Sequence, residues 1–363
     1  MGYGDYIIWT AIIRDLHKKI ESIENIQKKK EYLNSIKYED HYDIGIINYR
    51  LKDINKPFKF IIYCTWMHRI NFKKYTEVPQ CDEIFKNNPY VTDDELYENI
   101  IAIKIMSNYY WKKKNLKSYY ENFYIDDDKH FVSKIAERLK LDKYELHGQI
   151  VFTKKEYKKI KKLLPKNDFI LINYQGKVDS RSYLKSNIQK VVNYLKDKIE
   201  CVQIIPESFQ EIEFNKLDNV TVFYNKFTFR EAMCFASYAK YSILNHGGSS
   251  NGIACSKVKT ICLYSNLFNP IATNFKTEIP YIFSNHEGGF CYEIYCKKCL
   301  QSKEKNDYNE LLNLIKKHFD LIKYNKGYQL IESIKSKYDL NDKIKINEII
   351  KLIEDKFNLS EYS

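Results

Sequence analysis

Long hydrophobic runs are absent from this 363-residue sequence. The longest run, Phe60 to Met67, is strand-sized, whereas a helix that crosses a bilayer needs roughly 18 to 20 apolar residues. The N-terminal residues also lack the basic start, apolar core and small-residue cleavage site of a signal peptide. We therefore expect a cytoplasmic protein without a membrane anchor. Its nine cysteines are expected to be reduced thiols without disulfides.

Glycine and proline are scarce, at 11 and 7 residues, and the chain has no low-complexity linker and no repeat of solenoid period. Hydrophobic residues make up 44% and aromatic residues 15%, which is typical of a folded chain. At this length two domains are expected rather than one. We place them at residues 1–155 and 156–335, followed by a C-terminal helix over 336–363 that packs back on the body.

A concentrated basic arm is also missing, although the net charge is +12. The lysines are spread along the chain and mixed with 47 acidic residues. A positive charge favours a nucleic acid, an anionic membrane or a phosphorylated substrate. Because the charge is dispersed and no nucleic-acid-binding motif is present, we expect no nucleic-acid partner. Peripheral contact with an anionic membrane stays open.

What the second half does contain is a regular alternation of strands and helices. Strands are predicted over 169–174, 200–206, 220–224, 241–245 and 260–265, and helices over 182–198, 207–217, 227–239 and 249–256. This alternation predicts an α/β, Rossmann-like domain with a doubly wound parallel sheet.

The first half is less regular. Apolar residues at helical spacing predict a helix directly after residues 2–5, with Asp5 as its N-cap. Strands are predicted over 44–49 and 58–64. Helical and loop segments are expected from there to about Lys140.

Three of the few glycines lie between Ile243 and Ser256, just beyond a predicted strand. Parallel doubly wound sheets bind ligands at this position. Gly247 and Gly248 would let the backbone approach an oxyanion, and Ser249 and Ser250 would add hydroxyl donors. The spacing fits neither a dinucleotide fingerprint nor a Walker A loop. The segment therefore favours a diphosphate ligand, and the alternative is a tight turn with a serine as N-cap.

A second glycine segment, with Gly2, Gly4 and Asp5, precedes the first predicted helix. A carboxylate on such a loop can act as a general base toward a substrate hydroxyl. Asp5 is compatible with both roles, base and helix cap.

These segments, taken in order, resemble those of the lipopolysaccharide heptosyltransferases, glycosyltransferase family 9. The similar stretches are residues 2–19, 83–91, 137–156, 169–192, 230–256 and 291–299. The resemblance implies the GT-B fold, with two Rossmann-like doubly wound domains and a cleft between them. Two features depart from the family: no strand precedes Gly4, and His246 and Asn251 stand where the family commonly has an aspartate and a histidine.

The resemblance implies transfer of a sugar from a nucleotide-diphosphate sugar to a hydroxyl of a glycan or glycolipid acceptor, with inversion. Asp5 would be the catalytic base. Residues implied to bind the nucleotide sugar are Gly4, Lys177, Arg181, Glu207, His246, Gly247, Gly248, Ser249, Ser250 and Asn251. Lys177 and Arg181 would stabilise the leaving diphosphate in place of a metal, and Glu207 would bind the ribose. The alternatives are a solvated loop for Lys177 and Arg181 and a helix-start carboxylate for Glu207, which is the favoured interpretation of that residue. No metal and no cofactor besides the donor are expected.

Other interpretations stay open. A sugar-nucleotide epimerase could use the same fold, and a non-enzymatic nucleic-acid-binding protein would bind oligonucleotides in a salt-dependent way. A glycosyltransferase without activity would also fit the departures at His246 and Asn251. Cys291, Cys296 and Cys299, with His286, have a spacing that could hold zinc.

Overall fold

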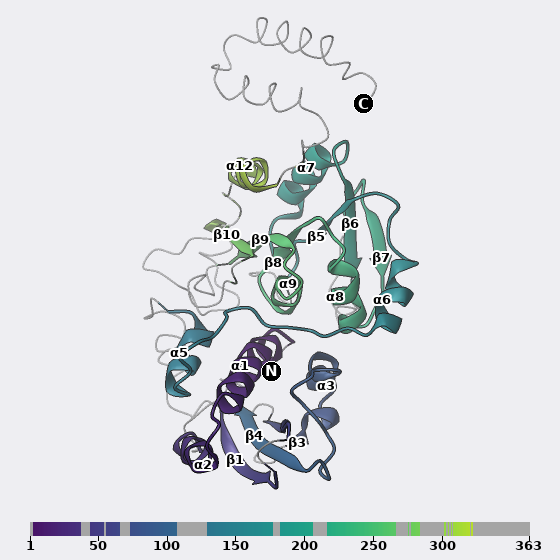
Figure 1. Ribbon diagram of the computed structural model, residues 1–363. Helices are drawn as coiled ribbons and strands as arrows, with labels where there is room; N and C mark the ends of the chain where they lie inside the picture. Colours follow the sequence, from purple (N-terminus) through teal and green to yellow (C-terminus); the bar gives the residue numbers. More distant parts are fainter. Residues whose placement is uncertain are drawn as a thin grey trace, which may run out of the picture.

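The protein is described from a computed structural model that contains two β-sheets with their helices (Figure 1). The structure describes residues 3–37, 44–53, 56–65, 73–106, 129–176, 182–205, 216–265, 275, 277–283, 301–302, 304, 306, 308–319 and 321. The predicted C-terminal helix over 336–363 lies outside these residues, and the predicted boundary between residues 155 and 156 stays a prediction.

The N-terminal sheet has four strands in the order β1-β4-β2-β3. Their bounds are β1 Ile44–Leu51, β2 Lys59–Thr65, β3 Lys73–Lys74 and β4 Asn99–Met106. Only β2 and β4 are parallel, while β1 pairs antiparallel with β4 and β3 pairs antiparallel with β2. The expectation of a doubly wound N-terminal half is therefore wrong for this sheet. The link from Leu51 to Lys59 is too short for a crossover helix, which needs about a dozen residues.

The strand β4 was not predicted, although it lies in the middle of the N-terminal sheet. Ile101, Ile103 and Ile105 on one face of it are all 0% exposed. This alternation of isoleucines is itself a strand signal. The expectation of helix and loop up to Lys140 was wrong at β4.

Helices pack on the N-terminal sheet as α1 Tyr3–Glu21, α2 Ile26–Ser35, α3 Pro79–Phe85 and α5 Phe131–Arg138, with a short 3-10 helix over Tyr75–Glu77. As its spacing predicts, α1 buries Ile12, Leu16 and Ile20 in the N-terminal core. Its start differs from the prediction. The helix begins at Tyr3, so Asp5 lies inside the first turn and is not the N-cap.

The C-terminal sheet confirms the five strands that the sequence predicts and adds β10, which the sequence analysis did not predict. Most of the helix predicted over 207–217 lies outside the described residues. The six strands of the sheet follow the order β10-β9-β8-β5-β6-β7, and every pair is parallel. The strands are β5 Phe169–Asn173, β6 Glu200–Ile205, β7 Thr221–Tyr224, β8 Tyr241–Asn245, β9 Lys259–Tyr264 and β10 Glu278–Ile282. The order is that of a Rossmann-type sheet.

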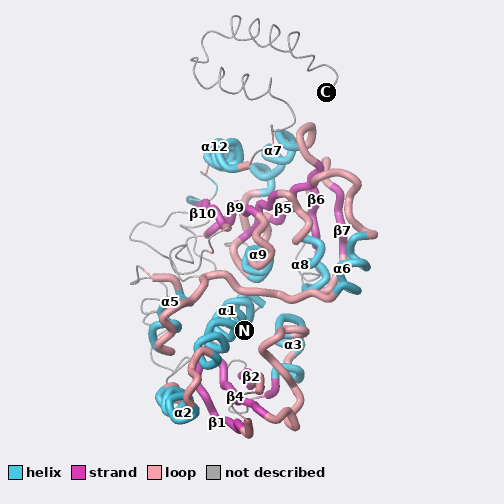
Figure 2. The backbone as a smooth tube through the Cα atoms, in the orientation of Figure 1, coloured by secondary structure: helices cyan, strands magenta, loops and turns pink. Residues whose placement is uncertain are grey.

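Helices cover both faces of the C-terminal sheet (Figure 2). They are α6 Lys154–Lys161, α7 Lys185–Leu195, α8 Phe229–Ala236, α9 Gly248–Ala254 and α12 Tyr308–His318. The helices α7 and α12 share a core with Ile170 and Ile172, whereas α6, α8 and α9 share one with Phe169 and Leu171. Alternate residues of β5 therefore serve opposite layers, as a strand buried on both faces requires.

The segment over residues 145–151 runs along α1 before it reaches the C-terminal sheet. The Arg14 guanidinium donates to the carbonyl of His147 (2.9 Å), and the Gln149 N–H donates to Thr10 Oγ1 (2.7 Å). Gly148 is pressed against the helix, since a Cβ there would lie 2.4 Å from the Ile7 carbonyl oxygen. A glycine is needed at this close approach.

Replacing Gly148 with alanine is expected to lower the free energy of unfolding by about 1–3 kcal/mol, because the new methyl group meets backbone that cannot move aside. Chemical denaturation of the purified chain measures the change. Gln149→Ala is the control, since its bond to Thr10 uses the backbone N–H. Equal stability of the Gly148 variant and the control would contradict the close packing.

Candidate functional site

The strand order of the C-terminal sheet changes direction between β5 and β8. From β5 the chain adds β6 and β7 on one side, and then returns to place β8 against the other side of β5. Loops that leave two such neighbouring strands in opposite directions open a crevice at their carboxyl ends, where doubly wound sheets bind ligands. The loops predicted to bind the nucleotide sugar follow these two strands.

The loop after β5 starts and returns at the carboxyl end of that strand. The Gly176 N–H donates to Ser182 Oγ (3.0 Å), and the Tyr183 N–H donates to the Tyr174 carbonyl (2.7 Å). These bonds close the base of the loop that carries the predicted cations. Lys177 and Arg181 themselves lie outside the described residues.

The turn after β8 is built around Gly247. Its φ of 153° lies in a region that side-chain-bearing residues rarely adopt, and a Cβ there would meet nothing within 4 Å. The requirement for glycine at Gly247 is therefore conformational rather than steric. Ser250 holds the turn, since its hydroxyl donates to the Gly247 carbonyl and accepts from the Gly247 N–H, each at 3.1 Å.

The predicted ligand-binding residues of this turn differ in exposure. His246, Gly247, Gly248 and Ser249 are half-buried, whereas Ser250 and Asn251 are buried at 0% and 4% exposure. The His246 ring stacks on the Tyr264 ring, with centroids 4.3 Å apart. The hydroxyl of Ser250 is engaged inside the turn, so the half-buried residues are the ones that face outward.

The two predicted glycine segments meet in the structure, although about 240 residues separate them. The Asn251 side-chain Nδ2 lies 3.5 Å from the Gly4 carbonyl oxygen and donates to it. A Cβ on Gly248 would lie 3.2 Å from Tyr3 Cβ and 3.4 Å from the Gly4 nitrogen. Without side chains at these two glycines, the first turn of α1 can touch α9. A cleft between the halves stays a prediction, because the described residues are in close contact at this point.

Of the remaining predicted residues, only the backbone of Asp5 is described, and it directly follows Gly4 in the first turn of α1. Glu207 lies outside the described residues, as do His286 and the three cysteines of the predicted zinc spacing. In the described part of the chain, no group of three or more His, Cys, Asp or Glu side chains is arranged to hold a metal ion. No helix among the described residues is long and apolar enough to span a bilayer.

Glu278, at the start of β10, is a buried carboxyl beneath the glycine turn that the sequence did not reveal. Its Oε2 accepts from the Phe275 N–H (2.8 Å), and the side chains of Ser250 and Cys262 lie beside it. Burial raises the pKa of Glu278 to about 7, against the opposing effect of these polar neighbours. The carboxyl therefore lies next to Ser250, whose hydroxyl holds the Gly247 turn.

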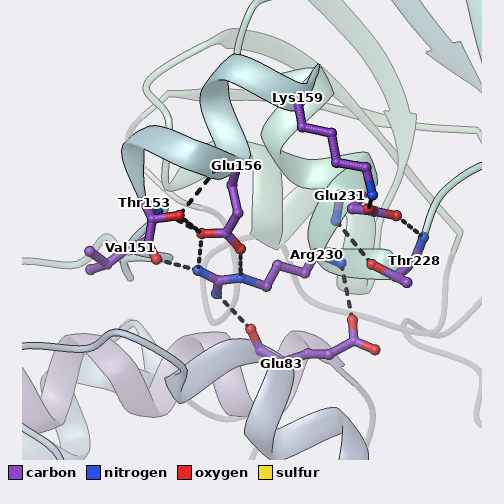
Figure 3. A network of polar contacts seen from close by, with 8 residues as sticks. All are labelled: Glu83, Val151, Thr153, Glu156, Lys159, Thr228, Arg230 and Glu231. Carbon is purple, nitrogen blue, oxygen red and sulfur yellow. Dashed lines mark hydrogen bonds and ion pairs between the residues drawn. The ribbon is translucent and has the colours of Figure 1, made fainter. Parts of the chain in front are cut away.

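Arg230, the second helical residue of α8, joins the two halves beside the glycine contact (Figure 3). Its guanidinium donates to Glu156 Oε1 (2.5 Å), to the Glu83 carbonyl (2.8 Å) and to the Val151 carbonyl. Its backbone N–H donates to Glu83 Oε2 (3.0 Å). A carboxylate from α3 thus caps a helix of the other half. Burial would raise the pKa of Glu156, but the bonds from Arg230 and Thr153 hold it at about 2.

Two aromatic rings continue this contact toward the glycine turn. The Tyr3 ring stacks on Phe229, with centroids 3.8 Å apart and an interplanar angle of 8°. The Tyr3 hydroxyl donates to Glu83 Oε1 (3.3 Å), so one carboxylate bonds with both α1 and α8. Burial, together with this neighbouring carboxylate, raises the pKa of Tyr3, which therefore stays protonated as a donor.

An open cavity of about 620 Å³ lies at the opposite, amino ends of β5, β6 and β8. It is lined by Asn167, Asp168, Lys196, Asp197, Lys198, Ile199, Glu200, Lys240 and Leu321. Doubly wound sheets bind ligands at the carboxyl ends of the strands, so we do not assign the site to this cavity.

Comparison with known proteins gives matches among solved structures. A glycosyl transferase of family 9 from Veillonella parvula is 12% identical with a TM-score of 0.40, over 53% of this chain and 61% of that one. The ADP-heptose heptosyltransferase II of E. coli is 11% identical with a TM-score of 0.34, over 49% and 57%. The E. coli heptosyltransferase WaaC with ADP is 14% identical with a TM-score of 0.38, over 53% and 58%.

The chain thus covers less than two thirds of the length of each of these structures. The names of these structures are those of heptosyltransferases and of glycosyltransferase family 9. No family model matches the chain. No curated protein matches it either.

Glu278→Gln is expected to remove a pH dependence of stability. The carboxyl has an ordinary pKa of 4.5 and a folded-state pKa of about 7, so its stabilising contribution is complete below 4.5 and is lost as the pH rises through 7. The loss in the wild-type chain should be on the order of 3 kcal/mol.

Urea unfolding at several pH values across this window measures the effect. Glu310→Gln, which changes an exposed carboxyl on α12, should keep the wild-type profile. Parallel profiles for wild type and Glu278→Gln would contradict the buried, protonated carboxyl.

Arg230→Ala is expected to destabilise the fold by about 3–5 kcal/mol, because the Glu156 carboxylate and the carbonyls of Glu83 and Val151 lose a buried donor. Arg230→Lys should recover only part of this, since lysine cannot donate to three partners in a fixed fork. Thermal unfolding measures both changes. Arg50→Ala, an exposed arginine on β1, serves as the control and should cost less than about 1 kcal/mol. If the Arg230 variants have the same Tm as the Arg50→Ala control, the contact between the halves does not stabilise the fold.

Proposed function

We propose that this protein is a glycosyltransferase that moves a sugar from a nucleotide-diphosphate sugar to a hydroxyl of a glycan or glycolipid acceptor. The observation that carries the proposal is the site at the strand-order change. The glycine turn after β8 and the closed loop after β5 lie at neighbouring carboxyl ends, and the first turn of α1 from the other half contacts the turn. A donor bound on one half would thereby face groups from the other.

In the proposed reaction, the Asp5 carboxylate takes the proton of the acceptor hydroxyl as general base. The acceptor oxygen bonds to the anomeric carbon while the bond from that carbon to the diphosphate oxygen breaks, which inverts the configuration. The position of Asp5 supports this role, because it follows Gly4, whose carbonyl accepts from Asn251 at the glycine turn.

The leaving diphosphate would gain its stabilisation from backbone N–H groups around Gly247 to Ser249 and from the cations Lys177 and Arg181. Fixed cations of this kind can replace a metal ion, so the proposed transfer is metal-independent. Glu207 is proposed to bind the ribose. The solved structures to which the chain is similar include one determined with ADP and one with ADP-2-deoxy-2-fluoro heptose, which makes nucleotide diphosphates the first ligands to test.

The test is a thermal-shift screen of nucleoside diphosphates and their sugars. A ligand at 100 times its dissociation constant contributes about 2.7 kcal/mol, which should raise the Tm by several degrees. Gly247→Ala should abolish this shift, because alanine cannot keep the φ of 153° that shapes the turn. Asn193→Ala, an exposed residue of α7, should keep it.

Two outcomes would contradict the proposal. The first is stabilisation by oligonucleotides alone, with a salt dependence that marks phosphate binding. The second is conversion of the bound sugar nucleotide to an epimer when no acceptor is present, which would identify an epimerase.

A further inference from the structure

Two buried thiols face each other in the N-terminal half. Cys64 lies near the end of β2 and Cys81 lies in α3. Their sulfur atoms are 2.7 Å apart, and the residues are 1% and 0% exposed. Each belongs to the N-terminal hydrophobic core.

This separation falls between two ordinary distances. A disulfide bond measures about 2.05 Å, and non-bonded heavy atoms attract most strongly at roughly 3.5–4.0 Å. Because both side chains belong to packed elements, the two sulfurs are held face to face. Cys64 is paired with Ile105 in the sheet, and the Cys81 N–H donates to the Val78 carbonyl at 2.9 Å. The two sulfur atoms would have to move closer by only a small distance to form a disulfide bond.

We propose that Cys64 and Cys81 form a reversible dithiol–disulfide pair that reacts with small-molecule disulfides. In the first step, the thiolate of one cysteine attacks the small disulfide and releases one thiol, which leaves a mixed disulfide on the protein. The second thiolate then attacks that bond and releases the second small thiol. Two protein thiols lose two electrons and two protons, and one small disulfide is reduced to two thiols.

The pair is adjacent to the contact between the two halves. Glu83 follows Cys81 by two residues in α3, and its carboxylate accepts from the Tyr3 hydroxyl and the Arg230 N–H. A covalent tie from α3 to β2 would restrain the helix that carries Glu83. Oxidation would therefore stabilise the hydrogen bond from the Arg230 N–H in α8 to Glu83 in α3.

The burial of the two thiols determines when the disulfide can form. Burial and the neighbouring sulfur raise the pKa of the Cys81 thiol, so little thiolate is present in the native core. Reaction with the folded chain should be slow, and reaction during refolding, when both thiols are exposed, should be fast.

The experiment refolds the full chain with oxidised and reduced glutathione, blocks free thiols with an alkylating agent and digests with trypsin. The expected product joins the peptide over residues 60–69 to the peptide over residues 75–86 through Cys64 and Cys81, and dithiothreitol should separate the two. Cys201→Ala, which removes a buried thiol from the other half, should still give this product. Cys64→Ala should not.

Hydrogen exchange on the same samples tests the link to α8. The amide of Arg230, which donates to Glu83, should exchange several-fold more slowly in the oxidised chain than in the reduced one. Complete alkylation of Cys64 and Cys81 after oxidative refolding would overturn the proposal, and so would preferential pairing of either with another cysteine. Because the wild-type chain carries the decisive measurement, a variant that fails to fold does not weaken the test.

Discussion

The arrangement of the two sheets depends on the satisfaction of one buried cation, Arg230. A guanidinium that is 5% exposed must donate its hydrogens to protein groups, since an unpaired buried charge costs several kcal/mol. Its partners come from α3, from the segment before α6 and from α6 itself, so the requirement can be met only when these elements are in place together. The carboxylate of Glu83 then bonds with both α1 and α8. Close contact between Gly4 and Gly248 follows from that arrangement.

The C-terminal sheet was predictable because the sequence pattern of each segment indicates the same element that the folded sheet contains. Its strands are short apolar runs that are buried on both faces, and helices of ordinary length separate them. The N-terminal sheet was not predictable to the same extent. Its strands pair in both directions, and β1 joins β4 at a separation of about 50 residues, which no local pattern encodes. The start of α1 was also misplaced, because Asp5 resembles a cap whereas contact with α9 favours a helix that already includes Gly4.

Some residues of the candidate site could likewise be predicted from the sequence, and others could not. Glycines and serines after β8 could be recognised from sequence, because the turn needs a residue with the φ of Gly247 and the strand before it is clear. Glu278 and Glu83 could not be, since a single acidic residue carries no sign of the partner that it will meet. Ser250 shows another limit of prediction from residue type. Its residue type suggested a ligand donor, but its hydroxyl bonds within the turn. Residue type indicates the chemistry that is available, and burial decides where it is used.

The long reach of α1 has a consequence for synthesis of the chain. This helix is made before the residues that it contacts, since its bond through Thr10 to Gln149 spans 139 residues, and its contact with Asn251 spans 247. At a translation rate of about 5–20 residues per second, roughly 12 to 50 seconds pass between the appearance of Gly4 and that of Asn251. During that interval the apolar face of α1 has only part of its final cover. Apolar surface that is exposed in this way on a nascent chain is prone to aggregation until the later residues are made.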